Sequence, residues 1–294
     1  MQLLTSPAFL LLSTGALLGL IFPFGKMASQ ADVSPVVWAF IVTVVPALTL
    51  MVGKLLTRKQ LGLNIKHVKY YFIAALVSLV IPNVLTFSVI PRLGSGFTGL
   101  LFTLSPILTL VFSSVWHVRV PNALGSIAIV FGFVGAVLVA VTRGELNSSA
   151  SIWWTLAGIG IPLSLAIGNV YRTLAWPKDS NPFDLALGVN LAAAIILLIA
   201  IVILPAHQLP GGVESIKFIA TVAALAASIM AVLHFRLQFY GGPTFLSQIS
   251  YLAAAVALAF GTVFFNEQYA LLTWIGAVLI VIGTMIGIVA QKKR

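Results

Sequence analysis

The feature that most constrains this chain is the length of its apolar runs. Ten apolar stretches, each close to the ~20 residues that a membrane-spanning helix needs, follow one another along the sequence. Only 7% of the 294 residues are charged, whereas a soluble domain has about 25%. The runs also lack the polar and apolar alternation that is typical of barrel strands in a membrane. The sequence therefore predicts an all-α integral membrane protein with ten transmembrane helices.

The connections between these stretches are short and rich in turn-forming residues. No soluble domain fits between the helices. We expect the first run to be retained as a helix, because it lacks the basic leader segment of a signal peptide. The ten helices are expected at residues 7–28, 35–56, 70–90, 95–116, 122–142, 152–174, 184–204, 216–238, 243–265 and 269–290.

The basic residues predict an orientation in the membrane. Lys and Arg accumulate in the cytoplasmic loops of membrane proteins. With a cytoplasmic N-terminus, 12 of the 16 Lys and Arg residues fall on that side, all except Lys26, Arg92, Arg143 and Lys217. We therefore expect an inner-membrane protein with both termini in the cytoplasm. These loops also account for the net charge of +10, so we expect no binding to nucleic acid.

The second half of the chain repeats the pattern of the first half. At a shift of 148 residues, Gly94 lies over Gly242 and Gly135 lies over Gly283. Each half then has five helices, and this odd number places the two halves in opposite orientations in the membrane. Inverted repeats of this kind are typical of secondary transporters. The predicted repeats span residues 1–145 and 150–294.

The segments at the end of each repeat resemble a known family. Small residues open the fourth helix at 94–96 (GSG) and the ninth at 242–243 (GP), and Glu267 follows in the second half. Together with ten helices and short loops, this pattern resembles the EamA-type transporters of the drug/metabolite transporter superfamily. Arg119 and Ala254 depart from it, since the family often has Glu and Pro there. The resemblance implies that helices 1, 3, 4, 6, 8 and 9 line a cavity, while 5 and 10 pack outside it.

The six acidic residues are placed in loops or at helix ends. An acidic residue near the bilayer centre is the usual carrier of coupling protons or sodium ions. Glu267 could be a coupling carboxylate, but we favour a structural role in which Asn266 caps the last helix and Glu267 faces the positive end of that helix. Lys26 is interpreted as an anchor that extends to the membrane surface.

Two titratable residues of the eighth helix are placed deeper than the others. His234 lies about one turn inside the helix end, and Arg236 follows it. His234 could contact the solute or carry a proton, or it could bond a neighbouring helix; Arg236 is expected to extend to the cytoplasm. Facilitated diffusion and proton exchange at His234 both remain open. Without cysteines or clustered acids, we expect no catalytic residue, no metal and no cofactor.

Neutral polar and aromatic residues complete the candidate site. A buried amide that faced lipid would be costly, so these groups must face protein or water. For any one of them, hydrogen bonding between helices is the alternative explanation. The predicted solute-binding residues are Phe22, Asn83, Phe87, Asn169, Tyr171, His234, Gln248 and Tyr251.

These features predict a secondary transporter of a small organic solute, such as an amino acid or a hydrophobic metabolite. The resemblance implies alternating access and export. Aromatic walls and neutral amides suit such a solute better than a sugar phosphate. A nucleotide-sugar or lipid-like substrate, a membrane enzyme and a non-transporting scaffold are the alternatives. The expected partners are the solute and membrane lipid, with the chain as a monomer or a homodimer.

Overall fold

The structure is a computed structural model that describes residues 6–58, 62–118, 122–141, 152–178, 180–203 and 213–292. Within these ranges every regular element is helical. The elements are α1 (Pro7–Gln30), α2 (Pro35–Leu56), η2 (Ile65–His67), α3 (Val68–Ala75), η3 (Leu76–Val80), α4 (Ile81–Leu93), α5 (Ser95–Leu101), η4 (Phe102–Leu104), α6 (Ser105–Val115), α7 (Ala123–Val141), α8 (Ile152–Leu174), α9 (Pro182–Ile203), α10 (Val213–Ser247), α11 (Ile249–Phe265) and α12 (Leu271–Lys292).

These elements form the ten transmembrane helices that the sequence predicts. Among the described residues, seven spans are long and apolar enough to cross a membrane, and the apolar stretches Ala123–Gly135 of α7, Ile249–Phe265 of α11 and Leu271–Gly283 of α12 complete the set. The third span combines η2, α3, η3 and α4, and the fourth combines α5, η4 and α6. The chain is therefore an all-helical, multi-pass membrane protein. The predicted boundary between the repeats, at residues 145 to 150, lies outside the described ranges, as does Arg119.

Proline explains where several helices begin and where the third span changes its winding. Pro7 and Pro35 stand in the first turns of α1 and α2, where a backbone N–H is not needed. Pro82 follows η3, which is a single π-helical turn. Ser164 of α8 donates a hydrogen bond of 2.8 Å to the Val77 carbonyl in that turn. A side chain from the second half thus satisfies a backbone carbonyl within the irregular turn of the first half.

The two halves carry matching kinks. Gly94, at the start of α5, has φ 84° and ψ 160°, and Gly242, inside α10, has φ 76° and ψ 178°. These are the two residues that the shift of 148 positions aligns. A positive φ is easily adopted by glycine alone, so each repeat turns sharply at the same place. The kink at Gly242 divides α10 into the eighth transmembrane helix and the first turn of the ninth.

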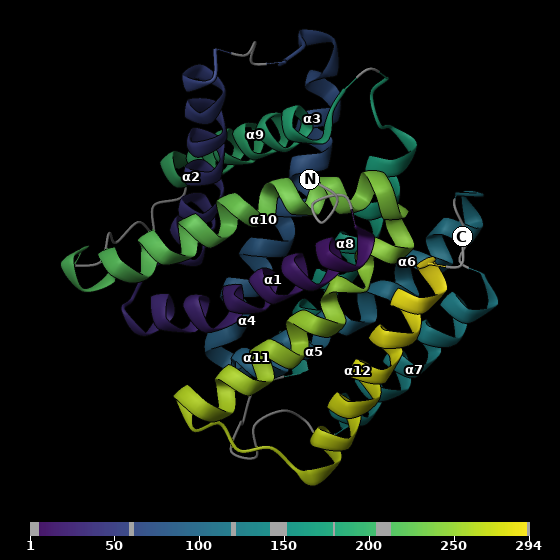
Figure 1. The fold of residues 1–294 in the computed structure, drawn as a ribbon. Helices are drawn as coiled ribbons and strands as arrows, with labels where there is room; N and C mark the ends of the chain where they lie inside the picture. Colours follow the sequence, from purple (N-terminus) through teal and green to yellow (C-terminus); the bar gives the residue numbers. More distant parts are fainter. Residues whose placement is uncertain are drawn as a thin grey trace.

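Matching glycines also join the last helices of the two halves. A Cβ atom on Gly135 of α7 would lie 2.5 Å from the carbonyl oxygen of Gly276 in α12. A Cβ atom on Gly283 of α12 would lie 2.7 Å from the carbonyl oxygen of Ala128 in α7. The two contacts are equivalent under the same shift, as expected for inverted repeats. Figure 1 shows α7 and α12 side by side at one edge of the molecule, with α2 and α9 toward the opposite edge.

α1 and α8 occupy equivalent central positions. α1 packs against α10 and α11, and α8 packs against α4 and α6, the matching helices of the other half. On α1, Cβ atoms at Gly15 and Gly19 would lie 2.9 Å and 2.5 Å from the Cβ atoms of Leu252 and Val256 in α11. This small-residue face lets two helices approach closely inside one molecule.

Candidate functional site

A central cavity of about 80 Å³ lies between the two halves. Apolar side chains such as Leu18, Ile21 and Phe102 from the first half, and Leu165 and Phe235 from the second, form much of its wall. None of the described lining residues comes from α7 or α12. α2 and α9 were not expected to line the cavity, but each contributes one residue to the wall. The polar residues of the lining are Ser78, Asn83, Thr86, Ser105, Asn169, Arg172, Asn190, His234, Ser247 and Ser250.

One part of the cavity wall is built around the guanidinium of Arg172 on α8, which is only 2% exposed. Its Nε donates a hydrogen bond of 2.7 Å to Oε1 of Gln238, and its Nη2 donates one of 2.8 Å to Oδ1 of Asn169. Nη2 also lies 2.9 Å from Nε2 of His234 on α10. Because a guanidinium can only donate, this geometry makes Nε2 of His234 the acceptor and places the ring proton on Nδ1.

Gln238 holds this network together. Its Nε2 donates hydrogen bonds of 2.9 Å to the backbone carbonyl of Asn169 and 3.0 Å to Oγ1 of Thr173. Asn169 in turn donates a hydrogen bond of 3.3 Å to Oγ1 of Thr109 on α6. The network therefore connects α8 and α10 of the second half with α6 of the first half.

Other polar groups of the lining have no hydrogen-bond partner among the described residues. The hydroxyl oxygens of Ser78 and Thr86 are buried and unpaired. Nearly all buried polar atoms in folded proteins are paired with protein, water or ligand. Both residues belong to the lining of the cavity.

Three of the predicted solute-binding residues meet in this cavity. Asn83, Asn169 and His234 all belong to its lining. Asn169 and His234 both contact Arg172, whereas Asn83 reaches the cavity from α4. His234 thus belongs to the cavity wall and also contacts Arg172 of a neighbouring helix.

The other five predicted residues are not part of this lining. Phe22 packs edge-on against Phe102, with the ring centroids 4.8 Å apart, and Phe87 packs against Trp38 at 6.5 Å. Tyr171 stacks on Tyr70 at 6.0 Å. Gln248 is buried beside the cavity, and its Oε1 has no partner among the described residues. Tyr251 points to α7, where its hydroxyl donates a hydrogen bond of 3.3 Å to the Ile129 carbonyl.

Sequence reasoning left Arg172 and Gln238 out of the candidate site. A signal for both was present in the helical spacing. Arg172 follows Asn169 by three residues, and Gln238 follows His234 by four, so each pair shares one face of its helix. Tyr171, the predicted solute-binding residue beside Arg172, lies on a different face of α8.

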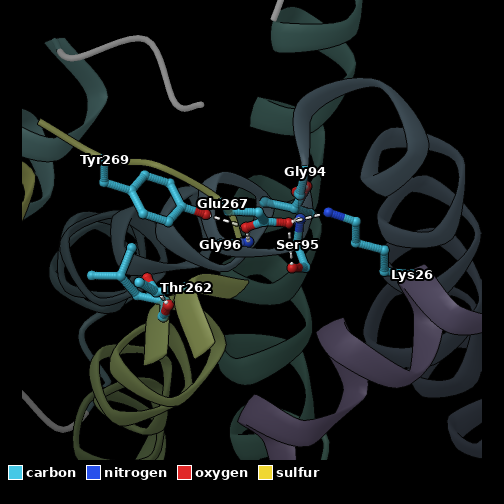
Figure 2. Close-up of polar contacts among 9 residues, drawn as sticks. Lys26, Gly94, Ser95, Gly96, Thr262, Glu267 and Tyr269 are labelled. Atoms are coloured by element: carbon cyan, nitrogen blue, oxygen red, sulfur yellow. Dashed lines mark hydrogen bonds and ion pairs between the residues drawn. The ribbon is translucent and has the colours of Figure 1, made fainter. Parts of the chain in front are cut away.

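A second polar cluster surrounds Glu267, far along the chain from its partners. Glu267 is 1% exposed. Lys26 of α1 donates to its Oε1 at 2.5 Å, and the backbone N–H and hydroxyl of Ser95 donate to the same oxygen at 3.2 and 2.9 Å. The N–H of Gly96 and the hydroxyl of Tyr269 donate to Oε2. Figure 2 shows the carboxylate enclosed between Lys26 and Tyr269 at the start of α5.

This cluster corrects the sequence interpretation of Glu267 and Lys26. Asn266 does not cap the last helix, because it has a left-handed φ of 51° and ends α11, while α12 begins only at Leu271. Glu267 does face a helix N-terminus, but that of α5 in the other half. Lys26 is not a free surface anchor, because it forms an ion pair with Glu267.

The environment of Glu267 stabilises its charged form. Burial raises the pKa of this carboxyl group, but the hydrogen bonds from Lys26, Tyr269 and Ser95 and the charge of Lys26 outweigh it and leave the pKa below its usual value. A Cβ atom on Gly96 would collide with Tyr269. The cluster is therefore a charged, tightly packed contact between the two halves.

The comparisons with known proteins agree with this architecture. A sequence profile described as the EamA-like transporter family matches residues 5–141 and 152–289. A solved structure, described only as the crystal structure of a protein, superposes with a TM-score of 0.66 at 16% identity over 95% of this chain and 98% of that one, which shows a shared fold. Comparison with curated proteins gives no significant match. Because the two profile matches cover most of the chain, one in each half, this protein belongs to the EamA-like transporter family.

Proposed function

We propose that this protein is a secondary transporter that moves a small organic solute, such as an amino acid or a hydrophobic metabolite, through the central cavity by alternating access. The observation that carries the proposal is that both inverted halves contribute residues to the cavity wall. When two such halves rock against each other, a site between them faces one side of the membrane and then the other.

The contents of the wall favour a small solute over a nucleotide sugar. A water molecule needs roughly 10–15 Å³ of such space, so the cavity has room for roughly five to eight groups of that size. A nucleotide sugar carries two phosphate charges, which call for several cations. Arg172 is the one Lys or Arg in the described lining.

We propose export across the inner membrane as the direction. This direction is what the resemblance in the sequence implies, and the 12 basic residues on one side support cytoplasmic termini. Coupling is proposed to be either absent or linked to His234, since neither carboxylate of the two described ion pairs, Glu267 or Asp184, belongs to the cavity lining.

Counterflow in proteoliposomes tests the proposal. Vesicles that contain the purified protein are loaded with an unlabelled amino acid or hydrophobic amine, and the uptake of labelled solute is followed at mildly acidic and mildly alkaline pH. We expect saturable exchange with some members of the panel. Parallel efflux and uptake assays in vesicles of known orientation then report the preferred direction.

A pair of variants on α10 tests whether the solute passes through the central cavity. Ala227 lines the cavity, whereas Leu225 on the same helix is 54% exposed. We expect Ala227→Phe to abolish exchange by filling the cavity and Leu225→Phe to leave it unchanged. Exchange that is absent for every solute with folded wild-type protein would refute the transport proposal, and equal exchange by both variants would refute this route.

A further inference from the structure

Arg172 is a buried cation to which the described structure supplies no negative partner. The carboxylates of the two described ion pairs, Glu267 and Asp184, are bound to Lys26 and Lys54. Asp32 is exposed in the connection between α1 and α2. The remaining acidic residues are Glu145 and Asp179, which lie outside the described ranges, and Glu214 of α10, of which only the backbone is described.

The guanidinium of Arg172 also has unused hydrogen-bonding capacity. It carries five N–H donors. Three of them are directed at Gln238, Asn169 and His234, and the two on Nη1 have no acceptor among the described residues. These three partners are neutral, so they orient the guanidinium without balancing its charge. A buried charge left in this condition is costly, and an anion that binds beside it removes much of that cost.

The other residues of the cavity wall indicate the chemical character of the molecule that carries this anion. No Asp or Glu occurs in the described lining, so the wall offers no charged site for an ammonium group. Ser78 and Thr86 are neutral polar residues of the wall, and Leu18, Ile21 and Phe102 supply apolar surface. The site thus combines one fixed cation, a few neutral polar groups and an apolar pocket.

We propose that Arg172 binds the carboxylate of the transported solute, and that the substrates are small monocarboxylates with an apolar body. This inference deepens the proposed transport function and rests on it. Arginine suits the task because its donors match the two oxygens of a carboxylate. Gln238, Asn169 and His234 act as positioning residues that hold the guanidinium against the cavity. An amino acid and the corresponding oxo acid share this chemistry.

The wild-type protein tests the proposal without any mutation. Binding to detergent-purified protein is measured by calorimetry and by thermal shift for four compounds with the same side chain: leucine, its oxo acid, leucinamide and isoamylamine. We expect the two carboxylates to bind about 10- to 100-fold more tightly than the amide and the amine, as loss of a charged hydrogen bond predicts. Leucine and the oxo acid distinguish a zwitterion from a simple anion as the preferred source.

Variants of Arg172 provide a second readout that a purely structural role would not move. We expect Arg172→Gln to lose the preference for leucine over leucinamide, and Arg172→Lys to keep part of it. Arg236→Gln is the matched control, because Arg236 is on α10 but not in the described lining, and it should keep the wild-type preference. Each variant is compared only if it elutes as a single species.

The two proposals fail in different ways. If amides and amines bind and exchange as well as the carboxylates do, and Arg172→Gln leaves this unchanged, the carboxylate assignment is wrong while transport stands. If no solute of any charge exchanges in proteoliposomes, the transport proposal itself fails. A carboxylate preference that persists in Arg172→Gln would also overturn the assignment, because another group would then bind the anion.

Discussion

At the scale of single residues, Glu267 and Arg172 are both buried charges, but only Glu267 has an oppositely charged partner among the described residues. Glu267 receives hydrogen bonds from Lys26, Ser95, Gly96 and Tyr269, so its charge is balanced within the protein. Arg172 has neutral partners alone among the described residues. A satisfied ion pair supports structure, whereas an unbalanced charge beside a cavity is typical of a binding site.

We expect Glu267→Gln to lower the free energy of unfolding by about 3–5 kcal/mol, because Lys26 would lose its counter-charge in a largely buried position. Thermal unfolding in detergent measures the change. Asp32→Asn is the matched control: Asp32 is exposed, and asparagine tolerates its φ of 56°. The control should shift stability by no more than about 0.5 kcal/mol. Equal effects from the two variants would contradict a structural role for the ion pair.

The same pair predicts a pH dependence. The pKa of Glu267 lies below its usual 4.5, so the charged carboxylate stabilises the fold fully above that pH. As the pH falls below 4.5 toward the folded-state pKa, this contribution is lost. The difference in melting temperature between the wild type and Glu267→Gln should therefore be largest near neutral pH and shrink in acid. A difference that stays constant with pH would show that the carboxylate charge is not what stabilises the contact.

At the scale of elements, glycine decides how the helices meet. Gly94 and Gly242 turn the chain at the same place in each repeat, and Gly135 and Gly283 bring the α7 and α12 backbones together. Inside a membrane the hydrophobic effect does not drive helices together, because lipid is as apolar as the side chains. Van der Waals packing between closely approaching backbones holds the helices together instead.

We expect Gly283→Ala to destabilise the protein by about 1–3 kcal/mol, because the added Cβ would meet backbone atoms of Ala128 and Gly132 that cannot move independently. Gly53→Ala on α2 is the contrasting case, since a Cβ there meets nothing within 4 Å. It should leave stability unchanged or raise it by about 0.5–1 kcal/mol, as alanine favours a helix over glycine. Melting temperatures in detergent compare the two. Similar losses would mean that helix packing at Gly283 is not the cause.

At the scale of the whole molecule, both described ion pairs cross between the halves. Lys26 near the end of α1 binds Glu267, and Lys54 near the end of α2 binds Asp184 at the start of α9. Because α1 and α2 are consecutive spans that cross the membrane in opposite directions, and each lysine lies near the end of its helix, the two pairs lie toward opposite sides of the membrane. The alternating access proposed above would require these two contacts to loosen in turn.

The absence of native cysteine makes the orientation directly testable. Gln30, at the end of α1, is exposed, and Ile65, between α2 and α3, is 84% exposed. With a cytoplasmic N-terminus, a membrane-impermeant thiol reagent should label Gln30→Cys in intact cells and Ile65→Cys only after permeabilisation. The wild type supplies the unlabelled background. The reverse pattern would invert the predicted topology.

The sequence by itself was enough for the class of fold. Ten apolar runs predicted ten helices, since a lipid environment leaves backbone groups no partners except within a helix, and most helix boundaries agree to within a few residues. The alignment of Gly94 with Gly242 predicted the repeat, and the family profile, which matches once in each half, confirms it. These properties depend on local composition and spacing, which a sequence displays directly.

The tertiary structure alone decided which polar residues meet. Glu267 and Lys26 are 241 positions apart and Arg172 and Gln238 are 66 apart, so neither contact follows from local spacing. The sequence interpretation gave Asn266 and Glu267 to the next helix, but the left-handed turn at Asn266 directs the chain back to α5. Helical periodicity shows that Arg172 and Asn169 share a face, but which face meets the cavity depends on how two inverted halves pack around it.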